Sequence, residues 1–202
     1  MTQAPPLSES FAQWWFAPWT YGGPALPAGC ASVLAYRDVY RHWCAETGIR
    51  AQLPPEADLR WQDAACSNGA RLLQAAELYG GLLAARRQRL AELAALAPAR
   101  RRWCLSVALT QPLADWSGEL PDALRNARGR GLAELALRLE RVFPGMWSRL
   151  RLLLPRDLDT PLARILAEHD PATEGPVHER DRRCWLLCMA RDNQDQPVQP
   201  EV

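Results

Sequence analysis

One long helical pattern dominates this sequence of 202 residues and runs from Ala70 to Ala97. Apolar residues, mostly leucine, recur along it at steps of three and four residues, and alanine, the best helix former, fills most of the gaps. Gly80 and Gly81 interrupt the pattern, and a glycine in a helix interior costs about 1 kcal/mol. We therefore expect a long helix with a kink, a close crossing with another helix or a break at the glycine pair.

Shorter helical patterns occupy most of the rest of the chain. The segment from Trp147 to Leu154 fits either a strand or a helix, and we predict a helix because no second strand is in view to pair with it. No alternation of strands and helices and no internal repeat occurs. The sequence therefore predicts an all-α fold of about eight helices of mixed length. Besides those already given, the predicted helices cover residues 31–47, a segment opening at Pro55, residues 98–109, residues 132–143, a segment opening at Pro161 with Thr160 as its N-cap, and residues 177–190.

The chain divides into three regions by composition. Residues 1–28 are rich in tryptophan and proline and have no stable helical or strand period, so they are predicted to form an irregular arm. Its aromatic side chains either pack on the helical body or dock a partner. Residues 29–190 are predicted to form one helical domain, with two lobes divided near residues 112–121 as the alternative. Residues 191–202 have no apolar period and predict a disordered tail.

Charge is segregated along the chain although the formal net charge is only +1, and every basic residue is arginine. Residues 71–102 carry a local charge of +5 and residues 125–156 a charge of +6, whereas residues 157–202 carry −5. Two interpretations remain open. The acidic segment neutralises the basic blocks within the chain, or a basic face docks an acidic partner.

The residues that carry most catalytic and metal chemistry are few and scattered. Cys184 and Cys188 share a helix face, with His178 upstream, but the other four cysteines lie apart among apolar neighbours, so we expect buried thiols rather than a zinc site. None of the three histidines accompanies a nucleophile signature, and no phosphate-binding loop occurs. We therefore predict no catalytic, cofactor-binding or metal-binding residue, and a protein that is not an enzyme.

The longest uncharged stretch, residues 10–36, is broken by prolines and glycines and does not predict a membrane-spanning helix. The first ten residues lack the positive charge of a secretory signal, so we expect a cytoplasmic protein with reduced cysteines.

The order of motifs from Arg71 to Pro155 resembles a known family. A leucine-rich segment, RLLQAAELYGGLLAARRQR, has a central glycine followed by paired arginines. A basic segment ending in QPLADW, the segment GLAELALRL, a proline-bearing turn and the segment RLRLLLP after Trp147 follow in that order. This order is similar to that of the SctK family of bacterial type III secretion, the YscK, PscK and OrgA-type proteins.

The resemblance implies a mostly helical cytoplasmic adaptor that performs no catalysis and holds no cofactor. Its partners would be the inner-membrane ring protein of the SctD type and the pod protein of the SctQ type. It would therefore lie at the inner membrane through the secretion apparatus, without inserting into the bilayer and without binding nucleic acid. The alternative is a helical nucleic-acid-binding or regulatory protein that uses the arginine clusters.

Seven residues are predicted to bind a partner. On one continuous helix, Arg86 and Arg89 would share a face while Arg87 lies about 100° away. The full predicted set is Arg86, Arg87, Arg89, Arg100, Arg101, Arg102 and Trp147.

Overall fold

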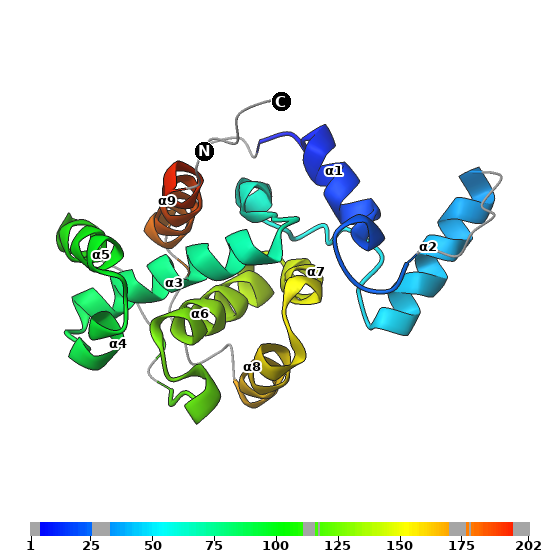
Figure 1. The fold of residues 1–202 in the computed structure, drawn as a ribbon. Coiled ribbons are helices and arrows are strands. Elements are labelled where there is room, and N and C mark those ends of the chain that lie inside the picture. The colour runs from blue at the N-terminus through cyan, green and yellow to red at the C-terminus, as the bar shows by residue number, and fades with distance from the viewer. Residues whose placement is uncertain are drawn as a thin grey trace, which may run out of the picture. The chain divides into compact units, whose positions relative to one another are not determined.

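A computed structural model describes residues 5–25, 33–110, 116, 118–169, 177 and 179–195. These residues contain no strand, so the predicted all-α fold class is confirmed (Figure 1). The α-helices of the described part are α1 (Glu9–Phe16), α2 (Val33–Thr47), α3 (Gly69–Arg86), α4 (Leu90–Ala94), α5 (Pro98–Thr110), α6 (Ala127–Val142), α7 (Met146–Leu150), α8 (Arg156–Glu168) and α9 (Glu179–Asp195). Short 3₁₀ helices are η1 (Pro18–Thr20), η2 (Leu59–Ala64), η3 (Asp122–Leu124) and η4 (Arg151–Leu153). No helix in the described ranges is both long and apolar enough to cross a bilayer.

The chain forms two compact units, and each is made of two separate stretches of sequence. Unit 1 comprises Met1–Asn68 and Leu139–Leu154, and unit 2 comprises Gly69–Arg138 and Pro155–Val202. The boundary predicted near residues 112–121 is therefore wrong. A loop signal in the sequence marks only where the chain turns. The division into units depends instead on long-range contacts, which join residues 139–154 to the N-terminal stretch.

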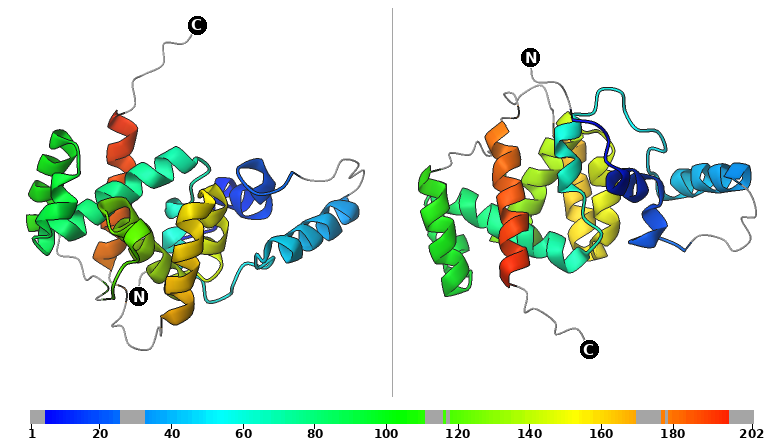
Figure 2. Two further views of the ribbon diagram at one scale, coloured as in Figure 1. Left: turned by 60° about the horizontal axis from the view of Figure 1, so that its bottom comes forward. Right: turned by 90° about the horizontal axis from the view of Figure 1, so that it is seen from above.

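Helix α3 is the centre of unit 2 and packs against α4, α5 and α9 (Figures 1 and 2). It runs without interruption through Gly80 and Gly81, so the alternative of a break there is wrong. The alternative of a close crossing is confirmed. A Cβ built on Gly80 would lie 1.7 Å from the Ala127 carbonyl oxygen, and a Cβ on Gly131 would lie 1.8 Å from the Ala76 carbonyl oxygen. Helices α3 and α6 therefore meet backbone to backbone at two glycines.

Unit 1 contains a helix where an irregular arm was predicted. Residues 9–16 form α1, whose N-cap Ser8 accepts a hydrogen bond from the Phe11 backbone N–H at 3.3 Å. The rings of Phe11 and Trp15 are both 5.5 Å from the ring of Phe143. Packing of this aromatic cluster on the helical body is thus confirmed for Phe11, Trp14 and Trp15, which are buried. The eight residues of α1 are too short a window for the helical period to be recognised.

Two predicted segment ends differ from the structure, and one segment of ambiguous pattern is helical. The segment after Trp147 is helical, as predicted, and forms the end of α7 and η4. Helix α8 begins at Arg156 after the extended residue Pro155, so Thr160 is not an N-cap and Pro161 lies inside the helix. Helix α9 continues through Asp195, so the predicted tail is helical over residues 191–195, while residues 196–202 lie outside the described part.

Candidate functional site

The paired arginines of the first motif, Arg86 and Arg87, lie where α3 ends. The backbone N–H of Arg89 bonds to the Ala84 carbonyl at 2.9 Å, that of Gln88 bonds to the Ala85 carbonyl at 3.3 Å, and Gln88 has φ of 55°. This is the Schellman arrangement of a helix C-terminus, with glutamine in the left-handed position that glycine usually occupies. The chain then turns into α4, so the predicted helix from Ala70 to Ala97 is two helices.

This turn separates the arginines that were predicted to share a helix face. Arg86 and Arg87 are exposed at the end of α3, where a positive charge also interacts favourably with the helix dipole. Arg89 is half-buried and is the N-cap residue of α4. The prediction that Arg86 and Arg89 lie on one helix face is therefore wrong. Arg86 and Arg87 remain as an exposed basic pair, which we name the α3 arginine pair.

The second predicted cluster, on α5, is only partly available to a partner. Arg100 forms an ion pair with Glu77 of α3, with 2.8 Å between Nη1 and Oε2. Only 22% of the Arg100 side chain is exposed. Arg101 is half-buried and Arg102 is exposed. Arg100 therefore joins α5 to α3, and of these three arginines only Arg102 is exposed.

Trp147, the last predicted binding residue, is only 2% exposed and lies in unit 1. A buried indole has no surface through which to bind a partner, so this prediction is corrected. The large apolar ring that suggested an interface anchor fills the protein interior instead.

Much of the second basic block is neutralised inside unit 2. Arg128 pairs with Glu77 at 3.6 Å, and Arg130 pairs with Glu92 at 3.6 Å. These contacts favour intramolecular neutralisation of residues 125–156. The carboxylates, however, come from α3 and α4, whereas the sequence suggested the acidic segment of residues 157–202.

A buried charge cluster on α6 was not predicted. Arg138 forms an ion pair with Glu134, lies 3.8 Å from the Asp181 carboxylate of α9, and stacks over the Tyr79 ring of α3 at 5.7 Å. Burial lowers the pKa of Arg138, and the surrounding groups raise it by more, so the guanidinium stays charged. The spacing of Glu134 and Arg138, four residues apart, was the sequence signal for this pair. Asp181 belongs to the acidic segment of residues 157–202, so this contact joins that segment to the basic block of residues 125–156.

The cysteines of unit 2 are buried thiols, as predicted. Burial raises the pKa of Cys104 to about 12 and that of Cys184 to about 11, and it raises the pKa of Cys188 well above its usual range. Such thiols stay protonated at neutral pH and are poor nucleophiles. His178, considered with Cys184 and Cys188, lies outside the described residues. No group of three potential metal ligands occurs among the residues that the structure describes.

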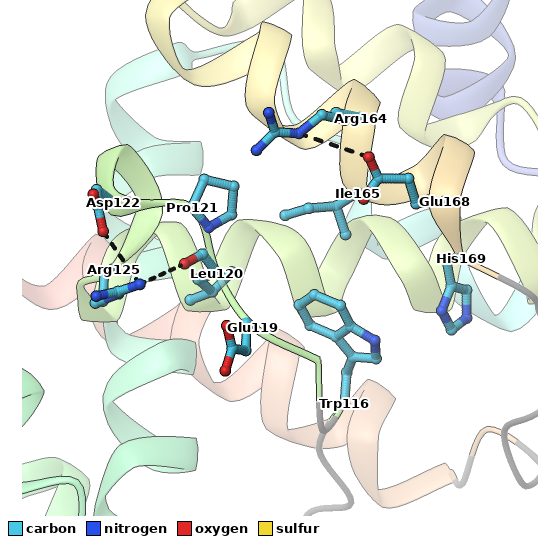
Figure 3. Close-up of a pocket in the computed structure, with 10 residues that line it drawn as sticks. All are labelled: Trp116, Glu119, Leu120, Pro121, Asp122, Arg125, Arg164, Ile165, Glu168 and His169. Atoms are coloured by element: carbon cyan, nitrogen blue, oxygen red, sulfur yellow. Dashed lines mark hydrogen bonds and ion pairs between the residues drawn. The ribbon is translucent and has the colours of Figure 1, made fainter.

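A cleft of about 810 Å³ in unit 2 lies between the segment before α6 and the end of α8 (Figure 3). Arg125 lies at one end, 3.2 Å from Asp122, and His169 lies at the other. Arg164 and Glu168 form a further pair at 3.9 Å along its wall. These arginines face carboxylates on their own elements, so the described lining of the cleft has mixed polarity.

The chain was compared with protein-family models, curated proteins and solved structures, and none of them matches.

Proposed function

We propose that this protein is a structural adaptor of a type III secretion sorting platform. It links the cytoplasmic domain of an SctD-type inner-membrane ring protein to an SctQ-type pod protein, and it acts by binding rather than by catalysis. It is a cytoplasmic protein held at the inner membrane through the apparatus. The observation that carries the proposal is the order of motifs from Arg71 to Pro155.

The positions of these motifs in the fold support the proposal. Gly80 of the first motif and Gly131, which opens GLAELALRL, form the crossing of α3 and α6, so this part of the pattern lies in the helical frame of unit 2. The paired arginines that follow the glycines are the exposed α3 arginine pair. A frame with a basic pair at its end suits recognition of an acidic protein surface, where charge governs association rate and specificity.

The test uses a bacterium that carries this gene together with type III secretion genes. Deleting the gene should abolish secretion of type III substrates and leave the membrane rings assembled, as judged by ring purification. Normal secretion by the deletion strain would contradict the proposal.

The α3 arginine pair is tested in the same strain. Complementation with the double variant Arg86→Glu, Arg87→Glu should reduce secretion and co-purification with the pod or ring protein at least tenfold, because it reverses the local charge. A single exposed ion pair contributes only about 0–1 kcal/mol, so Arg86→Ala alone should have a mild effect. Unchanged co-purification of a folded double variant removes this pair from the binding surface.

The alternative, a helical nucleic-acid-binding or regulatory protein, receives less support from the contacts. Arg100, Arg128 and Arg130 are engaged by carboxylates of the same unit, which lowers the number of guanidinium groups available to phosphates. Salt-sensitive binding of the purified protein to DNA or RNA at sub-micromolar affinity would favour this alternative over the adaptor.

A further inference from the structure

Unit 1 carries an apolar groove on α2 that the proposed function does not use. Its volume is about 460 Å³. The lining residues, which define the α2 groove, are Phe16, Tyr36, Arg37, Tyr40, Arg41, Ala51, Gln52 and Leu53. Phe16 is 41% exposed and Tyr36 39% exposed, which is high for aromatic side chains. Leu34, 72% exposed, lies one turn before Arg37 on the same side of α2 and extends the apolar surface.

The floor of the groove is held rigidly by Tyr40. Its hydroxyl donates a hydrogen bond to the Ala51 carbonyl at 2.6 Å and accepts one from Arg149 Nη2 at 3.0 Å. The Phe16 ring stands edge-on to the Tyr40 ring, with 5.8 Å between centroids. The groove is therefore formed before any partner binds, which reduces the entropy lost on association.

The charge of the groove has one sign. Arg37 and Arg41, four residues apart on α2, are both exposed, and no carboxylate lines the groove. Of the neighbouring acids, Glu46 pairs with His42 at 3.1 Å and Glu56 pairs with Arg50 at 3.4 Å, while Asp38, exposed on α2 between the two arginines, is not part of the groove lining. Two guanidinium groups therefore flank an aromatic surface without a carboxylate partner from unit 1 among the described residues.

We propose that the α2 groove docks an acidic segment of a partner protein that bears one or two large apolar side chains. The apolar side chains enter between Phe16, Tyr40 and Leu53, and carboxylates pair with Arg37 and Arg41. Side chains four apart on a helix have Cβ atoms about 5–6 Å apart, a spacing that carboxylates at i and i+4 of a partner helix or i and i+2 of a strand reproduce. Tyrosine and arginine are also the residue types that concentrate binding energy at interfaces.

This docking site is separate from the α3 arginine pair and does not depend on the secretion proposal. It lies in unit 1, its two arginines are on α2, and its chemistry is set by the aromatic lining. The two sites can therefore be tested separately, because each has its own pair of exposed arginines.

The experiment selects binders of the full chain from a displayed library of random 12-residue peptides. The most enriched sequence is then synthesised with a fluorescein label and titrated by fluorescence anisotropy. We expect enriched peptides to combine Asp or Glu with Phe, Trp or Leu. Their affinity should fall at least tenfold for Arg37→Glu, Arg41→Glu and also for Phe16→Ser. The matched variant Arg156→Glu, Arg180→Glu, at two exposed arginines of unit 2 outside both proposed surfaces, changes the net charge equally and should stay within about twofold of the wild type. Circular dichroism confirms that each variant is folded.

Several results would overturn the proposal. These are a library that yields no enriched sequence, enriched peptides without net negative charge, or equal binding by the Arg37→Glu, Arg41→Glu variant. Sedimentation of the wild type as a dimer that this variant converts to a monomer would show that a second copy of the chain occupies the groove. Binding of a labelled single-stranded DNA that is lost in this variant would assign the groove to nucleic acid. None of these outcomes bears on secretion, so failure here is distinguishable from failure of the adaptor proposal.

Discussion

Arg149 shows how one side chain can join distant parts of unit 1. It is fully buried and donates hydrogen bonds to the backbone carbonyls of Trp15, Gly145 and Arg50 at 2.9–3.1 Å, and to the Tyr40 hydroxyl. Its guanidinium carbon lies 3.5 Å from the centre of the Trp15 ring. Burial lowers the pKa of Arg149, yet the carbonyl dipoles, the hydroxyl and the indole face replace the water that the charge has lost.

Replacement of Arg149 by methionine is expected to destabilise the protein severely. The change keeps a long side chain but leaves buried oxygen atoms without a donor, and each such group costs about 1–3 kcal/mol. We expect a loss of at least about 3 kcal/mol in the free energy of unfolding, measured by urea denaturation with tryptophan fluorescence. Arg41→Met, which changes an exposed arginine of the same unit, should stay within about 0.5 kcal/mol. Equal stability of the two variants would contradict this account of Arg149.

Sequence reasoning could not identify Arg149, because its partners are mostly backbone carbonyls. Every residue has a carbonyl, so no side-chain pattern marks the acceptors, and those of Trp15 and Arg50 are 134 and 99 positions away in the chain. The Glu134–Arg138 pair, by contrast, is local and follows from a spacing of four residues.

At the level of elements, glycine has opposite effects in local propensity and in packing. Gly80 and Gly131 each weaken the helix they belong to by about 1 kcal/mol relative to alanine. They nevertheless permit α3 and α6 to cross with backbone atoms in contact, as the 1.7 and 1.8 Å approaches of added Cβ atoms show. We expect the crossing to stabilise the fold by more than this loss of helix propensity.

This balance can be tested with Gly80→Ala and Gly131→Ala. Propensity alone predicts stabilisation by about 1 kcal/mol, whereas the clash with carbonyl oxygens predicts a loss of about 3 kcal/mol or more because the backbone must separate. Thermal unfolding followed by circular dichroism at 222 nm distinguishes the two signs. Gly48→Ala is the control, since its Cβ would meet no atom within 4 Å and only the φ of 68° adds strain, about 1–2 kcal/mol. Higher melting temperatures for both crossing variants would show that the helices separate at little cost.

The helices themselves were the most predictable part of the fold, and their ends the least. Apolar periodicity located α2, α3, α5, α6 and α9 because each spans enough turns for the period to show. The end of α3 was missed because Gln88 adopts the left-handed conformation where the sequence offers no glycine. Of the predicted site, the α3 arginine pair and Arg102 are exposed, whereas Arg100 is paired and Trp147 is buried. Exposure depends on tertiary packing, which composition does not reveal.

Over the whole molecule, buried phenols and thiols recur in both units. Burial raises the pKa of Tyr21 and Tyr40 in unit 1, and that of Tyr79 in unit 2, as it does for the cysteines of unit 2. In the unfolded chain these groups ionise at about pH 8.5 for cysteine and about pH 10 for tyrosine. The folded state keeps these groups neutral to higher pH. Their contribution to the free energy of unfolding is therefore complete below the pKa values of the unfolded chain and decreases as the pH rises above them.

Stability should therefore be constant from about pH 7 to 8 and fall steadily above about pH 8.5. Melting temperatures measured between pH 7 and pH 11 by circular dichroism check this expectation. In Cys104→Ala, whose folded thiol has a pKa of about 12, the decline should be shallower than in the wild type. A melting temperature at pH 10.5 equal to that at pH 7.5 would contradict the assignment of these groups as buried and neutral.

Because unit 1 is made of two separate stretches of sequence, its folding depends on the order of synthesis on the ribosome. The stretch up to Asn68 emerges first, but Leu139–Leu154, with Phe143 and Arg149, must follow before unit 1 can close. At about 5–20 residues per second, the intervening synthesis lasts roughly 4–17 s. During this interval Trp15 and Phe11 have no access to the ring of Phe143 or the guanidinium of Arg149. On every nascent chain Trp15 and Phe11 therefore lack these contacts for that interval, and we expect the core of unit 1 to close only after Leu154 has left the ribosome.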